Sequence, residues 1–386
     1  MQKNLNVNPF LVLFPILFSF FVMGFVDIVG IATSYVKQDF SLNDKLANLL
    51  PLMVFLWFAI CSFPTSIIMG RIGRKKTVLL SALVTSIGMV IPIFNYSFPT
   101  ILAAFAFLGI GNTILQVSLN PLLTSVVEKG KITSMLTLGQ FIKAISSFLG
   151  PIVVGIAVSF WGNWKYIFPI YLALTLLSFI WLYGSPVTEN KEESLEKNAG
   201  HKMFSLLKDT YLLSLFSVIV LIVGFEIGLM TAVPKYLHEY CQLPLEKGGL
   251  GCSLYYIART LGTFIGSILL AKVASRKVFI VSMFIAIASF LSFMFIKDTI
   301  IILVSLFIIG LACANVFPII FSNAIQSDSS KINEISALMI MGVAGGALIP
   351  PVMGIISDVT NQLTSLFVLL GILFYMLFVA LYILKK

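Results

Sequence analysis

The stretch FLVLFPILFSFFVMGFVDIVGIATSY, residues 10–35, decides the fold class of this chain. It is long enough to cross a bilayer, which takes about 20 mostly apolar residues in a helix, and it holds a single charged side chain, Asp27. The rest of the 386-residue chain is similar, since 59% of all residues are hydrophobic and 11% are charged, whereas a soluble domain carries about 25% charged residues. The sequence therefore predicts an all-α integral membrane protein.

Eleven more apolar runs follow the first, each bounded by charged or turn-forming residues. The predicted spans are 10–35, 47–69, 77–93, 100–126, 132–160 and 166–183 in the first half, and 211–236, 248–271, 278–296, 299–325, 335–356 and 363–383 in the second. The long charged stretch between the halves, with ENKEESLEKNAGHK at its centre, is typical of a linker. The sequence thus predicts two six-helix bundles, over 1–184 and 210–386, joined by a linker at 185–209.

Lysine and arginine gather on alternate loops between the predicted spans. The loop after the second span carries Arg71, Arg74, Lys75 and Lys76, and the linker and both chain ends are basic too. Because basic loops are retained on the cytoplasmic side, we expect the termini and the linker in the cytoplasm, and the protein in the cytoplasmic (inner) membrane of a bacterium. The net charge of +9 is spread over many loops, which argues against nucleic acid as a partner.

The two halves repeat at an offset close to 200 residues. Gly24-Phe25 returns as Gly224-Phe225, each just before an acid, and Lys131 returns as Lys331. Two six-span halves repeated in parallel are typical of secondary transporters, which bind substrate near the bilayer midplane. A transporter of this kind is expected to work in the lipid bilayer as a monomer.

The loop GRIGRKK at residues 70–76 resembles the loop motif of the major facilitator superfamily, Gly-x-x-x-Asp-Arg/Lys-x-Gly-Arg-Lys/Arg. The basic end of the motif is intact, while Gly70 replaces the Asp and Ser66 replaces the first Gly. The resemblance implies the twelve-helix major facilitator fold. It also implies a gating role for four loop residues, Arg71, Gly73, Arg74 and Lys75.

Four further stretches resemble the fucose/glucose/galactose:proton symporter branch of that superfamily. They are QVSLNP at 116–121, LGQ at 138–140, ARTLGT at 258–263 and GGALIPPVMGIISD at 345–358. The resemblance implies proton-coupled import of a sugar or sugar derivative by alternating access. The chain departs from the branch where Gln116 replaces a Glu, Lys143 replaces an Asn and Glu226 replaces a Gln. The acid of the first span, Asp27, also comes about one helical turn earlier than in the branch.

Four charges lie in the middle of predicted spans, namely Asp27, Lys143, Glu226 and Arg259. Such charges are costly and normally face a cavity or a partner. Proton coupling needs a carboxylate that titrates near the working pH, which burial and a nearby cation adjust in opposite directions. We therefore expect Asp27 and Glu226 to carry protons, paired with Lys143 and Arg259 respectively. Two static ion pairs are the structural alternative, and Lys143 could instead anchor the carboxylate of a sugar acid.

Polar and aromatic residues inside the spans are candidates for binding the substrate. The fourth span places three amides on one helical face, and amides both donate and accept hydrogen bonds, as a hydroxyl-rich ligand requires. Alternatively, such groups only join neighbouring helices. The predicted substrate-binding residues are Asn112, Gln116, Asn120, Gln140, Lys143, Asn315, Asn323, Tyr255, Tyr256 and Trp57.

Other classes of protein fit less well. Four cysteines and two histidines show no metal-binding spacing, so we expect no metal, no cofactor and no enzyme activity. A drug or metabolite:proton antiporter is the first rival, supported by Gly150-Pro151 with Gly155 in the fifth span. An uncoupled uniporter is a second rival, in which the four charges only stabilise the structure.

Overall fold

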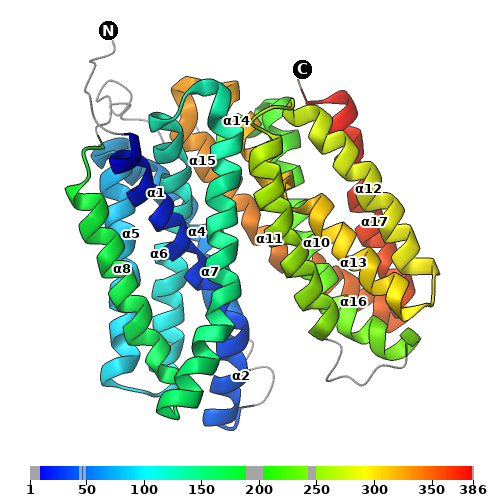
Figure 1. Cartoon of the computed structure of the whole chain (residues 1–386), viewed down its shortest axis with the longest axis horizontal. Helices are drawn as coiled ribbons and strands as arrows, with labels where there is room; N and C mark the ends of the chain where they lie inside the picture. The colour runs from blue at the N-terminus through cyan, green and yellow to red at the C-terminus, as the bar shows by residue number, and fades with distance from the viewer. Residues whose placement is uncertain (1–8, 43–45, 47–48, 188–202, 242–248, 385–386) are drawn as a thin grey trace. The chain divides into compact units, whose positions relative to one another are not determined.

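The computed structural model describes residues 9–42, 46, 49–187, 203–241 and 249–384, and these ranges form helices and turns with no strand (Figure 1). Most of the predicted linker, residues 188–202, lies outside the described ranges. The helices of the first half are α1 (Pro9–Met23), η1 (Gly24–Ile28), α2 (Val29–Asp39), α4 (Leu49–Ile72), α5 (Arg74–Phe94), α6 (Phe98–Val126), η2 (Lys129–Lys131), α7 (Ile132–Trp161), η3 (Trp164–Tyr166) and α8 (Ile167–Gly184).

The second half repeats this series of helices. They are η5 (Leu206–Lys208), α10 (Thr210–Cys241), α11 (Gly249–Leu269), α12 (Ser275–Phe295), α13 (Thr299–Cys313), α14 (Val316–Ser327), η7 (Ser329–Lys331), α15 (Ile332–Met341), η8 (Gly342–Ala347), α16 (Ile349–Val359) and α17 (Gln362–Tyr382). Each predicted span coincides with one helix or with a pair of helices joined by a short break. The all-α membrane fold predicted from the sequence is confirmed.

Eleven helices in the described part of the chain are long and apolar enough to cross a membrane. The predicted eighth span corresponds to α11, which is 21 residues long but lies outside that set of eleven. It carries Arg259 together with Tyr255, Tyr256 and Thr260. The predicted span that falls outside this set is thus one that bears a mid-span charge.

Three spans are broken by non-α backbone. The eleventh contains the six-residue 3-10 segment η8, where the sequence GVAGGA precedes Pro350-Pro351, as the glycines and prolines predicted. The tenth is interrupted at Ala314-Asn315, between α13 and α14. The first contains the 3-10 segment η1, which holds Asp27. Segments of 3-10 helix inside a long helix often mark hinges or functional sites.

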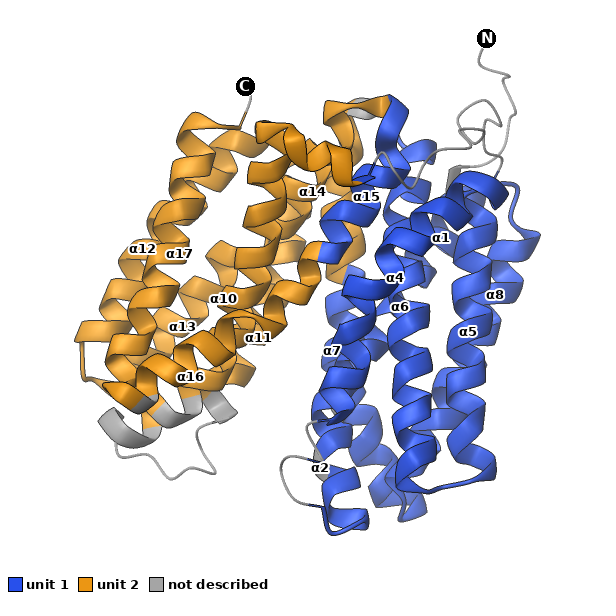
Figure 2. Ribbon diagram, turned by 180° about the vertical axis from the view of Figure 1, so that it is seen from behind, with its two compact units in different colours: residues 1–129, 142–203, 330–341 blue, residues 130–141, 204–329, 342–386 orange. Residues whose placement is uncertain are grey.

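The described chain forms two compact units (Figure 2). Unit 1 comprises residues 1–129, 142–203 and 330–341, and unit 2 comprises 130–141, 204–329 and 342–386. In unit 1, α15 packs on α4 and α6, and Ser336 donates to the carbonyl of Val117 at 2.7 Å. In unit 2, the first turns of α7 contact α11, where Ser134 donates to the carbonyl of Ser267 at 2.5 Å. The fifth and eleventh spans therefore each contribute a segment to both units.

The internal repeat is visible in how the helices pack. In unit 1, a Cβ on Gly109 would lie 2.6 Å from the carbonyl oxygen of Val54, where α6 touches α4. In unit 2, a Cβ on Gly310 would lie 2.6 Å from the carbonyl oxygen of Tyr255, where α13 touches α11. Both contacts bring two backbones together, which is how small residues join membrane helices.

A glycine in η8 allows a comparable close approach and gives a test of the packing. A Cβ on Gly345 would lie 2.2 Å from the carbonyl oxygen of Val220 in α10. We expect Gly345→Ala to destabilise the protein by about 2 kcal/mol, because overpacking forces backbone to move. Gly354→Ala is the matched control, since nothing lies within 4 Å of its Cβ position. Thermal unfolding in detergent should separate the two variants, and equal midpoints would show that η8 is not held against α10.

Candidate functional site

The break in the first span is held in place by α6 and α7 within unit 1. A Cβ on Gly24 would lie 2.6 Å from the carbonyl oxygen of Lys143 and 2.7 Å from the Cβ of Ser146. Only a glycine lets η1 approach α7 this closely. On the other side, the Asn112 amide donates to the carbonyl of Met23, the last residue of α1, at 2.8 Å. The geometry around Asp27 is therefore set by two neighbouring helices.

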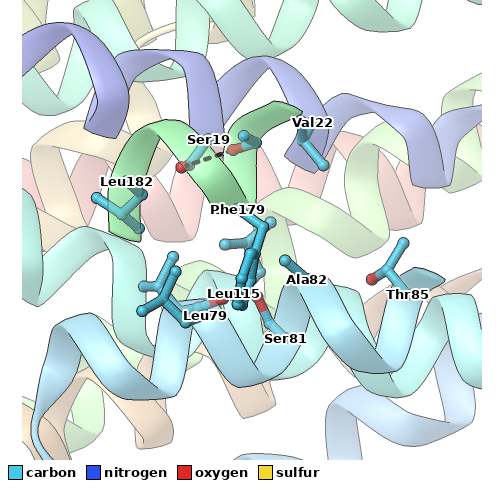
Figure 3. Close-up of a pocket in the computed structure, with 11 residues that line it drawn as sticks. Ser19, Val22, Leu79, Ser81, Ala82, Thr85, Leu115, Phe179 and Leu182 are labelled. Carbon is cyan, nitrogen blue, oxygen red and sulfur yellow. Dashed lines mark hydrogen bonds between the residues drawn. The ribbon is translucent and has the colours of Figure 1, made fainter. Parts of the chain in front are cut away.

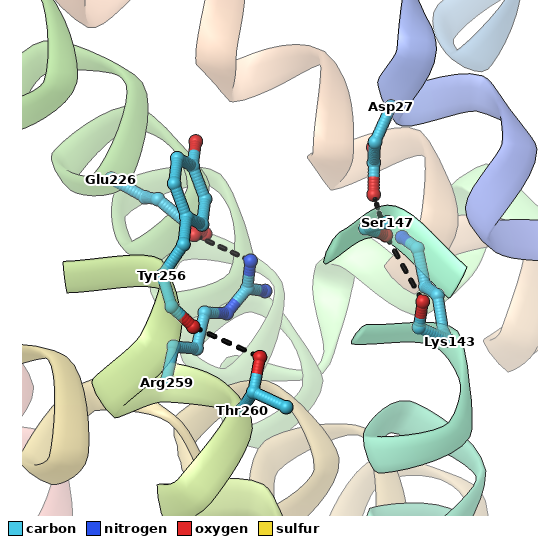
Figure 4. A network of polar contacts seen from close by, with 7 residues as sticks. All are labelled: Asp27, Lys143, Ser147, Glu226, Tyr256, Arg259 and Thr260. Carbon is cyan, nitrogen blue, oxygen red and sulfur yellow. Dashed lines mark hydrogen bonds and ion pairs between the residues drawn. The ribbon is translucent and has the colours of Figure 1, made fainter. Parts of the chain in front are cut away.

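Asp27 is exposed, while the residues on both sides of it, Val26 and Ile28, are buried. It lies inside the candidate membrane span Leu11–Thr33. Its carboxylate accepts a hydrogen bond from the Ser147 hydroxyl at 2.5 Å (Figure 4). A carboxylate at this depth is costly unless it faces protein or a water-filled cavity. Asp27 is thus an exposed carboxylate inside a candidate membrane span.

The predicted ion pair between Asp27 and Lys143 is not formed. Figure 4 shows the Lys143 ammonium directed toward Ser147 and Asp27, yet the described residues give it no hydrogen bond or ion pair. The Ser147 hydroxyl, one helical turn further along α7, contacts the carboxylate instead. Physically, the serine is short and held on its own helix by the Lys143 carbonyl at 3.0 Å, so its hydroxyl reaches Asp27 without ordering a long side chain.

The predicted ion pair in unit 2 is formed. Arg259 Nη1 of α11 lies 2.5 Å from Glu226 Oε1 of α10 (Figure 4). The side chain of Glu226 is 11% exposed and that of Arg259 is 36% exposed. Gly224, two residues before Glu226, permits close packing of α10 on α16. A Cβ added to Gly224 would lie 2.2 Å from the Ile349 side chain. The repeat therefore places an acid next to a close glycine contact in each unit.

The three amides of the fourth span are all buried within unit 1, between 1% and 4% exposed. Gln116 donates to Asn112 at 2.7 Å, and Asn120 donates to the Gln116 carbonyl at 2.8 Å. These two contacts lie within α6 itself, and the bond from Asn112 to α1 is the one that joins two helices, as in the structural alternative. The side-chain amide oxygen of Asn120 (Oδ1) has no hydrogen-bond partner among the described residues. Substrate binding by these amides stays a prediction.

The other predicted binding residues differ in how open they are. Asn315 is buried and donates to the carbonyl of Gly262 at 3.0 Å, and Asn323 donates to its own helix at Ile319. Tyr255 is 1% exposed, whereas Tyr256 is 42% exposed and its ring packs edge-on against that of Tyr255.

Two further candidates from the first half are Gln140 and Trp57. Gln140 is half-buried on the first turns of α7, in unit 2. Trp57 is half-buried on α4, in unit 1, and its indole N–H is buried with no acceptor among the described residues. A buried N–H without an acceptor is unfavourable, so an acceptor from water or a ligand would suit it.

The basic motif at residues 70–76 covers the end of α4, Gly73 between the helices, and the start of α5. Gly73 has φ of +89°, a backbone conformation that favours glycine. Arg74 is 7% exposed and donates to the Asn333 side chain of α15 at 3.0 Å. Lys75 donates to the carbonyls of Tyr183 and Ser185 at the end of α8, at 3.3 and 2.7 Å. Arg71 is exposed.

A cavity inside unit 1 is too small for the expected substrate. It measures about 10 Å³, the size of a single water, and lies between α1, α5, α6 and α8 (Figure 3). The hydroxyls of Ser19 and Ser178 meet beside it at 3.1 Å. This cavity belongs to the packing of the bundle.

Two contacts of these sites were not predicted from the sequence. Ser147 follows Lys143 by four residues and shares its helix face, but the sequence did not predict its contact with Asp27. The contact between Asn333 and Arg74 could not be found from the sequence. The two residues are 259 positions apart in the chain, so they form no local pattern.

Comparison with known proteins agrees with this architecture. The model of the Major Facilitator Superfamily matches residues 14–339. A glucose/galactose transporter of Brucella abortus is 26% identical, over 88% of this chain and 86% of the relative. A putative glucose/galactose transporter of Helicobacter pylori is also 26% identical, over 99% of this chain and 98% of the relative.

Two solved structures share the fold. The Escherichia coli fucose:proton symporter FucP superimposes with a TM-score of 0.82 at 18% identity, over 97% of this chain and 98% of that one. The proton:xylose symporter XylE gives 0.75 at 13% identity, over 97% and 96%. The helix order, the repeat and the family match over residues 14–339 show that this chain belongs to the Major Facilitator Superfamily and is a membrane transporter, not an enzyme.

Proposed function

We propose that this transporter imports a sugar or sugar derivative together with protons, by alternating access across the bacterial cytoplasmic membrane. Asp27 carries the proposal, because it is an exposed carboxylate at a backbone break in the middle of a membrane span. Relatives named glucose/galactose transporters and a fold shared with two proton:sugar symporters support the substrate class.

The proposed cycle uses charged residues already described, namely Asp27, Glu226 and Arg259. Asp27 takes a proton from the outer solution, which removes a charge that is costly to move across the bilayer. Substrate binds, the two halves rearrange, and both substrate and proton leave on the inside. In the second half, Glu226 faces Arg259 at 2.5 Å, and a proton on that carboxylate would weaken the ion pair. A single chain contains both Asp27 with Ser147 and Glu226 with Arg259, so a monomer is sufficient for the proposed cycle.

The distribution of basic residues supports the proposed topology. Positive charge on the loop after the second span, the linker and both chain ends favours a cytoplasmic location for these segments. Arg71 and Lys76 are exposed there, as residues facing anionic headgroups would be.

The proposal is tested by reconstituting the full chain in proteoliposomes with a pH-sensitive dye inside. Addition of hexoses and hexose derivatives under an inward proton gradient should acidify the lumen and concentrate the labelled sugar. Uptake without lumenal acidification would indicate a uniporter instead. Proton-driven movement of cationic drugs out of the vesicles, with no sugar uptake, would support the antiporter.

A further inference from the structure

Lys143 is a mid-span charged residue of unit 1 that the proposed cycle leaves unused. It is half-buried in the middle of α7, inside the candidate span Ile132–Trp161. Within the described residues it makes no hydrogen bond and no ion pair. A lysine at this depth normally pairs with another group or faces a water-filled pathway. Its three donors are therefore available to something that the protein itself does not supply.

The Asp27 carboxylate is a negative charge that lies near Lys143 in the described part of unit 1. Figure 4 shows the Lys143 ammonium on the same side as Ser147 and Asp27. The Asp27 carboxylate is directed at the Ser147 hydroxyl, so it offsets the positive charge of Lys143 through space without a direct contact. Two described groups that contact this segment are neutral, namely the Asn112 amide of α6 and the phenol of Tyr171 in α8, on whose ring Phe25 stacks with 3.9 Å between ring centroids.

Protonation of Asp27 removes the negative charge that balances the Lys143 ammonium. The carboxyl becomes neutral and the Lys143 ammonium keeps its full charge without a counter-ion. A ligand carboxylate then gains a charge-assisted hydrogen bond to the ammonium and meets no repulsion from Asp27. With Asp27 ionised, the same ligand would bring a second negative charge into the site. The proton must therefore arrive with the anion.

We propose that the sugar derivative carried by this chain bears a carboxylate, as a hexuronate does, and that Lys143 binds this carboxylate when Asp27 is protonated. The inference rests on the proposed function and names its substrate class. One proton and one monoanion enter together, and their charges cancel. The transporter loaded with both therefore has the same net charge as the empty transporter with Asp27 ionised. Transport is then electroneutral, whereas symport of one proton with a neutral sugar moves one positive charge inward.

The test compares two matched pairs of probes, glucose with glucuronate and galactose with galacturonate, in wild-type proteoliposomes. Under an inward proton gradient we expect uronate uptake to exceed hexose uptake by roughly tenfold or more, as one charged hydrogen bond would give. An inside-negative potential set with potassium and valinomycin should leave uronate accumulation unchanged. For a neutral sugar the same potential should raise accumulation about fiftyfold, which is one charge crossing about 100 mV.

Variants at position 143 separate the role of charge from that of shape. Lys143→Asn should lower uronate uptake roughly tenfold or more while hexose uptake stays the same or rises, and Lys143→Arg should retain part of the uronate uptake. Lys277→Asn, an exposed lysine in the first turn of α12, is the control and should behave as wild type.

The outcomes distinguish the two proposals. Accumulation of hexoses alone, enhanced by the potential, would overturn the carboxylate inference and keep the proposed function. Failure of all four probes, together with failure of neutral amino sugars, would overturn both. A Lys143→Asn variant that folds poorly would still leave the wild-type potential experiment to decide.

Discussion

Asp27→Asn should abolish accumulation of substrate against its gradient, so that the inside-to-outside ratio under an inward proton gradient falls to about one. Asparagine is nearly isosteric with aspartate and can still accept the hydrogen bond that Ser147 donates at 2.5 Å. It cannot release a proton, and coupling requires a group that does. The variant should nevertheless exchange labelled for unlabelled substrate across the membrane, because exchange needs no net proton movement. Counterflow measures the exchange of substrate, and proton-driven uptake in the same vesicles measures its accumulation.

Two further variants show whether the loss is specific. Asp298→Asn makes the same chemical change at the first turn of α13, where the carboxylate caps the N–H groups of Ile300 and Ile301. Asparagine caps as well as aspartate, so this variant should accumulate substrate normally. Ser147→Ala keeps the carboxylate and removes its donor, and it should keep accumulation with an altered dependence on external pH. Undiminished accumulation by Asp27→Asn would remove Asp27 from the coupling mechanism.

The fold could be predicted from the sequence because the bilayer leaves few choices. Every backbone group in the hydrocarbon layer must be satisfied within its own helix, so apolar runs of sufficient length gave all the spans to within a few residues. The break at 342–347 was also predictable, since two glycines and two prolines mark it. The break at η1 was not, because Gly24 alone signals it and its effect depends on close packing against α7.

The candidate site was predicted less completely, and the reason is geometric. Charge complementarity identified both acid–base combinations, and in unit 2 Glu226 and Arg259 do pair. In unit 1 the same rule was wrong for Asp27 and Lys143, because a hydroxyl one turn away competes for the carboxylate. The amide face headed by Asn112 illustrates a second limit. An amide stripe that faces a cavity and one that joins two helices have the same spacing, and the sequence does not tell which neighbour they meet.

Arg259→Met is expected to have the second large effect, this time on the amount of folded protein. It removes the cation that lies 2.5 Å from Glu226, whose side chain is 11% exposed. Removing one partner of a fully buried ion pair costs roughly 3–5 kcal/mol, and the cost here should lie near the lower end because Arg259 is 36% exposed. We expect a large drop in expression and in the thermal midpoint measured in detergent.

The asymmetry of burial predicts how the pair responds to the reciprocal change. Glu226→Gln leaves Arg259, which is 36% exposed, and a partly exposed guanidinium can recruit water, so this variant should lose much less stability. The double variant Glu226→Gln with Arg259→Met should recover most of the thermal midpoint, because no buried charge remains unpaired. Transport then separates structure from function. If the pair only holds α10 and α11 together, the rescued double variant should still accumulate substrate under a proton gradient. If Glu226 also carries a proton, the double variant should be stable, exchange substrate and fail to accumulate it.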